Sequence, residues 1–262
     1  MNTRILAELI ERIDIDDMFK LVYQPYVDLS IEEFVGAEAL LRCTHPMCTN
    51  QSILDIITML ERSGNIETIS QWVFKEAVSQ LKEWRDNNNC SDELTMSVNV
   101  SAALLRNDNF VQAILNIVQD AGVPGSSLMI EITETTVMED YAGCREAMLE
   151  LNEVGIEFAM DDFGTGYSSL ERLKEMPLSV LKIDRTFVKS MMTRTNDNAI
   201  IDASVRLGHA IGMTVIAEGI ETAEQAAALR LLGCDRGQGY YYSMPSPPHE
   251  IDLSPTLQKF AA

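Results

Sequence analysis

The feature that most constrains this 262-residue chain is a regular alternation of short apolar, β-branched runs with amphipathic stretches of helical period. The apolar runs, which we interpret as strands, occupy residues 21–29, 34–42, 95–101, 128–134, 157–162, 180–184, 214–219 and 237–243. The helical stretches occupy residues 3–13, 52–62, 66–86, 110–118, 141–151, 197–210 and 223–232. Strand–helix alternation implies a parallel sheet with right-handed crossovers, and about eight strands in this length predict a closed (β/α)8 barrel. No linker interrupts the pattern, so we expect one domain over residues 1–262.

Polar side chains stand at or near the C-terminal ends of the predicted strands. They are Glu38, Asn99, Glu131, Asp161, Lys182, Glu218 and Gln238, each from a different strand. Taken singly they have structural explanations: Glu38 could pair with Arg42, Asn99 could cap a turn, and Lys182 could pair with Asp184 or Glu131. The C-terminal ends of barrel strands converge on one face. Four acids, two amides and a lysine from so many strands therefore predict a shared polar site.

The run over 157–162 ends in two adjacent carboxylates, Asp161 and Asp162, followed by Gly164 and then by a Ser-Ser-Leu sequence that can open a helix. Neighbouring side chains of a strand point to opposite faces, so the two acids can meet only where the backbone turns. Two like charges held together favour a divalent cation between them. The alternative is a solvated Asp-Asp turn that caps a helix.

The candidate ligands are hard oxygen donors, which suit Mg²⁺ or Mn²⁺. They are Glu38, Asn99, Glu131, Asp161, Asp162 and Glu218. His45, His209 and His249 do not fall on strand ends, and no cysteine is spaced for zinc. So many carboxylates can hold two metals that share a bridging Asp, a pair that activates water in phosphoryl displacement. Lys182 could orient that water or offset negative charge.

Composition limits the partners. The formal net charge of −20 repels nucleic-acid backbone and anionic lipid, so we expect no nucleic-acid polymer as partner. A small phosphorylated ligand remains compatible if bound cations reverse the field locally. The five scattered cysteines indicate reduced thiols of a cytoplasmic protein, not a disulfide framework. The first 19 residues do not resemble a signal peptide, and no run of 18 apolar residues predicts membrane insertion.

Several motifs together, in this order, resemble the EAL-domain cyclic di-GMP phosphodiesterases over about residues 18–250. They are Tyr23-Gln24-Pro25, Glu38-Ala39-Leu40-Leu41-Arg42, Val98-Asn99-Val100-Ser101, Glu131-Ile132-Thr133-Glu134, Asp161-Asp162-Phe163-Gly164-Thr165-Gly166-Tyr167-Ser168-Ser169-Leu170, Lys182-Ile183-Asp184, Ala217-Glu218-Gly219-Ile220-Glu221-Thr222 and Gly237-Gln238-Gly239-Tyr240. The resemblance, to a stand-alone EAL domain, implies a modified TIM barrel with an antiparallel first strand, often dimeric. It also implies hydrolysis of cyclic di-GMP to linear 5′-pGpG with Mg²⁺ or Mn²⁺.

The resemblance further assigns roles to single residues. Glu38, Asn99, Glu131 and Asp161 resemble the ligands of a first metal. Asp161 resembles the bridge to a second metal, which Asp162 and Glu218 also serve. Lys182 resembles the residue that orients the water, with Glu221 and Gln238 as supporting polar groups. Arg42 resembles a phosphate contact, and Gln24 lies where the family approaches a guanine. Glu134 resembles the anchor of the loop over 164–168, which links metal occupancy to dimerisation.

Three departures from the family pattern adjoin these motifs: Cys43-Thr44 replaces an aromatic residue after Arg42, residues 47–51 lack the usual Gly and Pro, and Met244 replaces a common Arg. The first two adjoin the ligand pocket. Because Ca²⁺ takes more oxygen ligands at longer distances, we expect it to support binding and to inhibit cleavage. Two other hypotheses are a weakly catalytic EAL module that acts as a cyclic di-GMP receptor or protein-interaction module, and a barrel enzyme of different chemistry such as Mg²⁺-assisted enolate formation.

Overall fold

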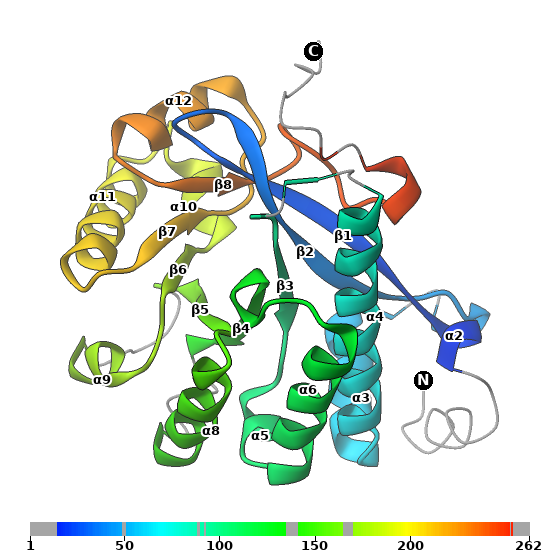
Figure 1. Cartoon of the computed structure of the whole chain (residues 1–262). Coiled ribbons are helices and arrows are strands. Elements are labelled where there is room, and N and C mark those ends of the chain that lie inside the picture. Colours follow the sequence, from blue (N-terminus) through cyan, green and yellow to red (C-terminus); the bar gives the residue numbers. More distant parts are fainter. Residues whose placement is uncertain are drawn as a thin grey trace.

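The computed structural model describes residues 15–48, 51–87, 90–91, 93–134, 141–164, 170–251 and 253. The predicted helix over 3–13 and residues 165–169 of the Asp-Asp motif lie outside these ranges. The strands are β1 (Phe19–Asp28), β2 (Glu33–Cys43), β3 (Thr95–Asn99), β4 (Leu128–Thr133), β5 (Glu157–Phe163), β6 (Val180–Ile183), β7 (Thr214–Ala217) and β8 (Arg236–Gln238). They form a closed barrel in chain order (Figure 1).

The first strand runs against its neighbours. β1 pairs antiparallel with both β2 and β8, and all the other neighbouring strands pair parallel. The predicted fold class, an α/β modified TIM barrel with an antiparallel first strand, is confirmed. β1 and β2 are also the longest strands, with 10 and 11 residues, and pair along their whole length as a ribbon. The ribbon continues beyond the pairing of β2 with β3, which ends at Ala39.

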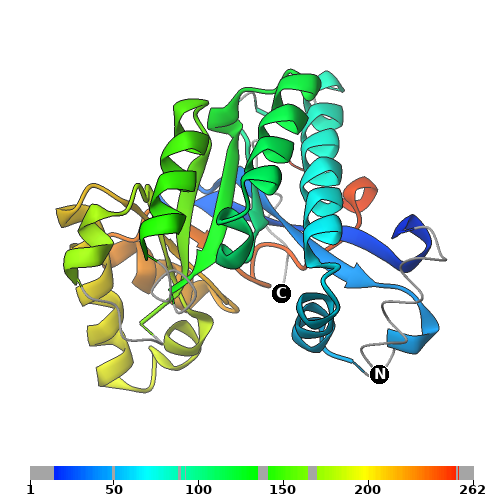
Figure 2. The ribbon, with the colours of Figure 1, turned by 90° about the horizontal axis from the view of Figure 1, so that it is seen from below.

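Helices cover the outside of the barrel. Those of the first half are α2 (Ile15–Met18), α3 (Ile53–Ser63), α4 (Ile66–Asp86), α5 (Ala102–Leu105), α6 (Asp108–Ala121) and α8 (Tyr141–Glu153). Those of the second half are α9 (Leu170–Glu175), α10 (Arg185–Ser190), α11 (Thr195–Ala210) and α12 (Ala223–Leu231). Three 3₁₀ turns complete the described elements: η1 (Pro46–Cys48), η2 (Gly125–Ser127) and η3 (Pro248–Glu250). Figure 2 shows α4, α6 and α8 side by side against the strands.

Helix α4 illustrates how the sequence makes these elements. Ile69, Val73, Ala77 and Leu81 recur at a spacing of four residues, and all four are buried against the barrel. Its neighbour α3 starts at a capping box in which Ser52 and Asp55 satisfy each other's backbone N–H groups. No helix among the described residues is long and apolar enough to cross a membrane.

The lower part of the barrel interior is an apolar layer. It consists of Tyr26, Met129, Ala159, Val180 and Ile216, which form a buried cluster separate from the core between strands and helices. Gly36 makes room for the largest member, because a Cβ at that position would lie 2.0 Å from the Tyr26 ring. The Tyr26 hydroxyl hydrogen-bonds to the Thr95 hydroxyl, which satisfies the polar tip of a buried ring.

One expectation from the sequence is wrong. Cys43 and Cys48 form a disulfide, whereas Cys90, Cys144 and Cys234 are free thiols as predicted. The pair comes together because β2 ends at Cys43 and the chain turns at once into η1, which places the two Cα atoms 6.1 Å apart. A separation within the usual 4.4–6.8 Å window allows the bridge.

Candidate functional site

The candidate site lies two residues further along the strands than the apolar layer, toward their C-terminal ends. Alternate residues of a strand share a face. Glu131, Asp161, Lys182 and Glu218 each follow a member of the apolar layer by two residues on the same strand, or directly after β7 in the last case. Together with Glu38 of β2 they form what we call the acid–lysine cluster. The strand ends therefore do bring the predicted polar residues together on one face.

Lys182 lies at the centre of the acid–lysine cluster and is 1% exposed. Its Nζ contacts Glu131, lies 2.5 Å from an oxygen of Glu218, and is 3.5 and 3.6 Å from oxygens of Asp161 and Glu38. Burial alone would lower the pKa of the ammonium, but the four carboxylates, Asp161 and Glu131 foremost, raise it well above its usual value. Lys182 therefore remains charged.

Two amides hold Glu38. Asn99 donates from Nδ2 to Glu38 Oε1 at 2.7 Å, and Gln238 donates from Nε2 to Glu38 Oε2 at 2.9 Å. Burial favours the neutral acid, but Lys182 and the two amides outweigh it and lower the pKa of Glu38. The alternative pairing of Glu38 with Arg42 is wrong, because Arg42 donates to the Leu41 carbonyl at 2.9 Å and makes no ion pair with Glu38.

The remaining pairing alternative for Lys182 is partly correct. Lys182 contacts Glu131, as one alternative had it, but not Asp184. Asp184 instead caps α10 by accepting a hydrogen bond from the Thr186 N–H at 3.0 Å. Lys182 is thus shared among four acids rather than paired with one.

The acids crowd one another beyond what one lysine compensates. Burial, and then the neighbouring Glu38 charge, raise the pKa of Glu131 well above its usual range. Burial raises the pKa of Glu218 to about 8, with Asp161 and Glu38 adding to the effect. Burial, and then Asp161 and Asp184, raise the pKa of Asp162 to about 6. Such shifts indicate a site that lacks positive charge.

The backbone turns between the adjacent carboxylates as the sequence predicted. Asp162 has a φ of 55°, in the left-handed region, and the pairing of β5 with β6 shifts register between Met160 and Phe163. As a result, Asp161 and Asp162 line the same cavity instead of opposite faces of the strand.

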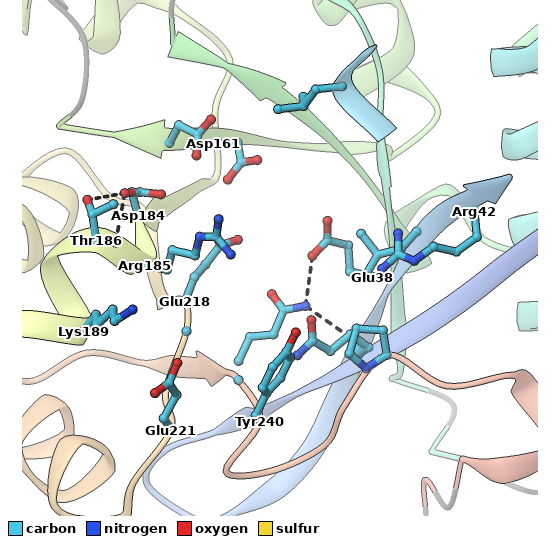
Figure 3. Close-up of a pocket in the computed structure, with 18 residues that line it drawn as sticks. Glu38, Arg42, Asp161, Asp184, Arg185, Thr186, Lys189, Glu218, Glu221 and Tyr240 are labelled. Atoms are coloured by element: carbon cyan, nitrogen blue, oxygen red, sulfur yellow. Dashed lines mark hydrogen bonds between the residues drawn. The ribbon is translucent and has the colours of Figure 1, made fainter. Parts of the chain in front are cut away.

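A cavity of about 710 Å³ opens above the acid–lysine cluster (Figure 3). It brings together residues predicted from the sequence: Gln24, Glu38, Arg42, Asp161, Asp162, Glu218, Glu221 and Gln238. Asn99 and Glu131 line a neighbouring, more apolar cavity of about 330 Å³, which shares Leu40, Arg42 and Leu54 with the first. Lys182 lies beneath the floor and lines neither cavity.

Sequence reasoning missed a second wall of the cavity. Arg185, Thr186 and Lys189 of α10 line it, as does Tyr240 after β8. The only sequence signal for the first three was the position of α10 directly after the polar end of β6. Glu134, predicted as a loop anchor, is 2% exposed and accepts a hydrogen bond from the Gly164 N–H at 3.3 Å. Residues 165–168 of that loop lie outside the described ranges.

The side chains of the acid–lysine cluster have the ligand chemistry that a hard divalent cation prefers, although Lys182 lies among the acids. Glu131 Oε1 and Asp161 Oδ1 are buried and accept no hydrogen bond. The atoms nearby that could ligate a metal are side-chain oxygens, which Mg²⁺ and Mn²⁺ prefer. In the described parts of the chain, no three His, Cys, Asp or Glu side chains are arranged to hold one metal ion. The ammonium of Lys182 occupies the space that their carboxylates surround.

Comparison with known proteins gives a consistent result. The family model of the EAL domain matches residues 7–245. The chain is 37% identical to the oxygen sensor protein DosP of Escherichia coli over 90% of this chain and 29% of that protein. It is 31% identical to the cyclic di-GMP phosphodiesterase PA2567 of Pseudomonas aeruginosa over 95% of this chain and 42% of that protein. The chain thus spans less than half the length of these curated relatives.

Solved structures agree with the sequence comparison. The fold matches that of the PaMucR phosphodiesterase in its c-di-GMP complex with a TM-score of 0.86 and 33% identity, over 94% of this chain and 98% of that chain. It also matches the EAL enzyme Bd1971 in its cAMP- and cyclic-di-GMP-bound form with a TM-score of 0.87 and 32% identity, over 94% of this chain and 67% of that chain.

Proposed function

This chain belongs to the EAL domain family, and we propose that it is a metal-dependent phosphodiesterase that hydrolyses cyclic di-GMP to linear 5′-pGpG. One observation carries the proposal: a cavity of about 710 Å³ stands directly over an acid–lysine cluster that has more carboxylates than compensating charge. PA2567 is a cyclic di-GMP phosphodiesterase by name, and PaMucR was solved with c-di-GMP, which supports the same ligand class here.

Glu38, Asn99, Glu131 and Asp161 would hold one cation, and Asp161, Asp162 and Glu218 a second. Divalent cations in such a site lower the pKa of a bound water and stabilise the leaving oxygen in phosphoryl displacement. The protein supplies the arrangement. Asn99 and Gln238 orient the Glu38 carboxylate through bonds of 2.7 and 2.9 Å. Lys182 gives the acids a fixed positive charge beneath the floor and is the candidate for orienting the attacking water.

The ligand would lie across the cavity. Arg42 on its wall is a fitting contact for a phosphate oxygen. We assign Gln24 to a guanine edge because it lines the same cavity, where its side chain donates to the Ser243 carbonyl at 3.1 Å and its backbone carbonyl accepts a hydrogen bond from Gln238. Glu221 also lines the cavity, and its backbone N–H donates to the Gln225 side chain at 2.7 Å, which fixes its backbone.

In our proposal, Glu134 connects the metal site to the formation of a homodimer. It is buried beside the end of β5 and bonds to Gly164 at the start of the loop over 164–168. Because Asp162 lies two residues before Gly164, the position of the loop and that of the proposed second cation depend on the same short segment. We infer that the protein forms a homodimer that responds to metal occupancy.

A second function has an observation in its favour. Lys182 lies among the carboxylates that would ligate the metals, and no described group of acids is arranged to hold an ion around it. A receptor that binds cyclic di-GMP without cleaving it would suit this arrangement.

One pair of titrations separates the two functions. The protein is incubated with cyclic di-GMP and Mg²⁺ or Mn²⁺, and pGpG is measured by chromatography; ligand affinity is measured in Ca²⁺. We expect cleavage with Mg²⁺ and Mn²⁺, binding without cleavage in Ca²⁺, and competitive inhibition by Ca²⁺, because its larger radius and 2.3–2.6 Å bonds misplace the water. Tight binding with no cleavage in any of the three metals would instead establish the receptor. Rapid cleavage in Ca²⁺ alone would contradict the proposed two-metal site.

A further inference from the structure

Helix α10 places two cations on the wall of the main cavity. Arg185 and Lys189 are four residues apart and therefore share a face of the helix, and both line the cavity (Figure 3). Neither forms an ion pair with a described residue, although Asp162, Glu218 and Glu221 line the same cavity. In a chain with 40 acidic and 20 basic residues, two such cations in one cavity suggest that a bound anion is their partner.

The surrounding structure fixes the root of this wall. A Cβ at Gly219 would lie 2.5 Å from the Cβ of Arg185, so the turn after β7 approaches the helix as only glycine allows. Gln225 donates to the Val188 carbonyl at 3.1 Å, and the Val188 side chain is fully buried. Because α10 cannot shift without breaking these contacts, Arg185 and Lys189 are presented from a preorganised backbone.

We propose that Arg185 and Lys189 bind the phosphate of the cyclic dinucleotide that is not cleaved, an inference that rests on the proposed function. A cyclic dinucleotide carries two phosphodiesters on opposite sides of its ring. Figure 3 shows Arg42 and Lys189 on opposite sides of the cavity, with the acids between them. One phosphate can therefore lie over the acids near Arg42 while the other meets α10. Without the α10 cations, the second phosphate would face only the negative field of the chain.

The test uses Arg185→Gln, Lys189→Gln and the double variant. Arg194→Gln is the matched control, because Arg194 is an exposed arginine just after α10 that does not line the cavity. Each single variant should weaken cyclic di-GMP binding in Ca²⁺ about 10-fold, the size expected for a charge-assisted hydrogen bond. The same variants should raise KM with Mn²⁺ to a similar extent and leave kcat within about threefold, because the contacts are the same in ground state and transition state.

Two further readouts separate a phosphate contact from a structural role. Arg185→Lys should recover most of the affinity lost in Arg185→Gln, and the double variant should bind with a weaker dependence on salt than the parent chain. Unchanged Kd and KM in the double variant would overturn the inference, as would a fall in kcat at constant KM. If the parent chain neither binds nor cleaves cyclic di-GMP, the proposed function itself fails.

A different observation carries a second inference. The Cys43–Cys48 disulfide closes a loop directly after Arg42, which lines both cavities, and five residues before Ile53, where α3 begins. Leu54 of α3 lines both cavities as well. Hydrogen bonds also hold this loop, among them Cys48 N–H to the His45 carbonyl at 2.9 Å and the Thr44 hydroxyl to the Met18 carbonyl at 3.2 Å. The bridge is thus a covalent tie between the end of β2, next to Arg42, and η1, the turn that precedes α3.

We propose that this pair is a redox-sensitive clasp that sets ligand affinity through the position of Arg42. In its oxidation by a low-molecular-weight disulfide, the partly exposed Cys43 thiolate attacks the reagent and releases one thiol. The Cys48 thiolate then attacks the mixed disulfide and releases the second thiol. The protein loses two protons and two electrons, and the reagent is reduced to two thiols. The oxidised form, which fixes the root of Arg42, is the form that binds more tightly.

The test equilibrates the protein in glutathione buffers and counts thiols with a chromogenic reagent under denaturing conditions. We expect five thiols in the reduced form and three in the oxidised form, and a cyclic di-GMP Kd at least about threefold lower when oxidised. Cys43→Ser and Cys48→Ser should each abolish the response, whereas Cys90→Ser, which removes a partly exposed free thiol, should retain it. Five thiols at every potential, or equal affinity in the two forms, would overturn the clasp.

Discussion

Two layers of side chains fill the barrel interior, and the same strands supply both. The lower layer is an apolar cluster that includes Ala159, Val180, Ile216 and the Tyr26 ring. Two residues further along the same strands, or just beyond β7, stand Asp161, Lys182 and Glu218, where the two acids surround the charge of the lysine. One step of the pleat thus separates a region built for stability from a region built for binding.

The two layers differ in what they contribute: the lower one to the stability of the fold, the upper one to ligand binding. Burial of apolar surface stabilises the lower layer without any geometric demand beyond close packing. In the upper layer Lys182 compensates the acids, and two buried oxygens, Glu131 Oε1 and Asp161 Oδ1, accept no hydrogen bond. Substitutions in the lower layer should therefore change stability and leave function, whereas those in the upper layer should change function, and should change stability as well where they remove the compensating charge.

The largest effect should come from removing the charge that holds the upper layer together. Lys182→Met leaves four clustered carboxylates without their ammonium, so we expect a loss of about 3–5 kcal/mol in the free energy of unfolding at neutral pH in EDTA. Excess Mg²⁺ should restore part of this loss, because a cation then occupies the same field. Urea unfolding with and without Mg²⁺ measures both. Parent-like stability in EDTA would show that Lys182 is not what compensates the acids.

A substitution in the lower layer should lower stability but leave turnover nearly unchanged. Ile216→Ala on β7, two residues before Glu218, removes a fully buried side chain and should cost about 3 kcal/mol of stability through the cavity it leaves. Turnover of cyclic di-GMP per folded molecule should remain within about threefold of the parent value, since Ile216 does not line the ligand cavity. A large fall in kcat at temperatures where the variant is folded would erase the distinction between the layers.

A charge removed from the upper layer should separate activity from stability. Glu38→Gln keeps the size of the side chain and removes one negative charge, so turnover should fall at least ~100-fold, or ~2.7 kcal/mol of transition-state stabilisation. The free energy of unfolding should fall by much less, about 1 kcal/mol, since the lowered pKa of Glu38 means that its charge is favourable in the fold and a Gln amide loses one of the bonds from Asn99 and Gln238. Metal-dependent turnover and urea unfolding on the same preparation give both values. Near-normal turnover would contradict the metal-ligand role of Glu38.

The smallest effect should appear at the edge of the upper layer. Glu134→Ala removes the acceptor of the Gly164 N–H, and we expect turnover to fall roughly fivefold, in line with the ~1 kcal/mol of a single hydrogen bond, together with weaker self-association. Glu134→Gln keeps an acceptor oxygen and is the matched control. Kinetics and sedimentation measure the two properties. If both match the parent chain, Glu134 does not anchor the loop.

Much of the fold and of the cavity floor could be predicted because both depend on local periodicity. The alternation of strands and helices fixed the number of strands, and carboxylates at strand ends marked one face of a barrel. The sequence could not say which acid Lys182 would contact, since the four candidates come from four other strands and all approach it. That sharing is a property of barrel closure.

Other features lacked a local signal or had one that was not used. Helix α10 has six residues, too few for a periodic pattern, so Arg185 and Lys189 were missed. The Cys43–Cys48 contact depends on a three-residue turn, η1, that composition does not reveal. The direction of β1 came from family resemblance, although a four-residue connection between Asp28 and Glu33 is too short for a parallel crossover.

The reversed direction of β1 also determines at which face of the barrel its first residue lies. In a barrel of parallel strands, the first strand starts at the face opposite the ligand. Here Phe19, the first residue of β1, pairs with Cys43, so the chain enters beside the rim of the ligand cavity. In the β1–β2 ribbon Gln24 pairs with Glu38, and residues 15–18 directly precede the first residue of β1. We therefore expect a force or a docking partner that moves residues 15–18 to shift Arg42 and Gln24 through the paired strands β1 and β2, without crossing the barrel.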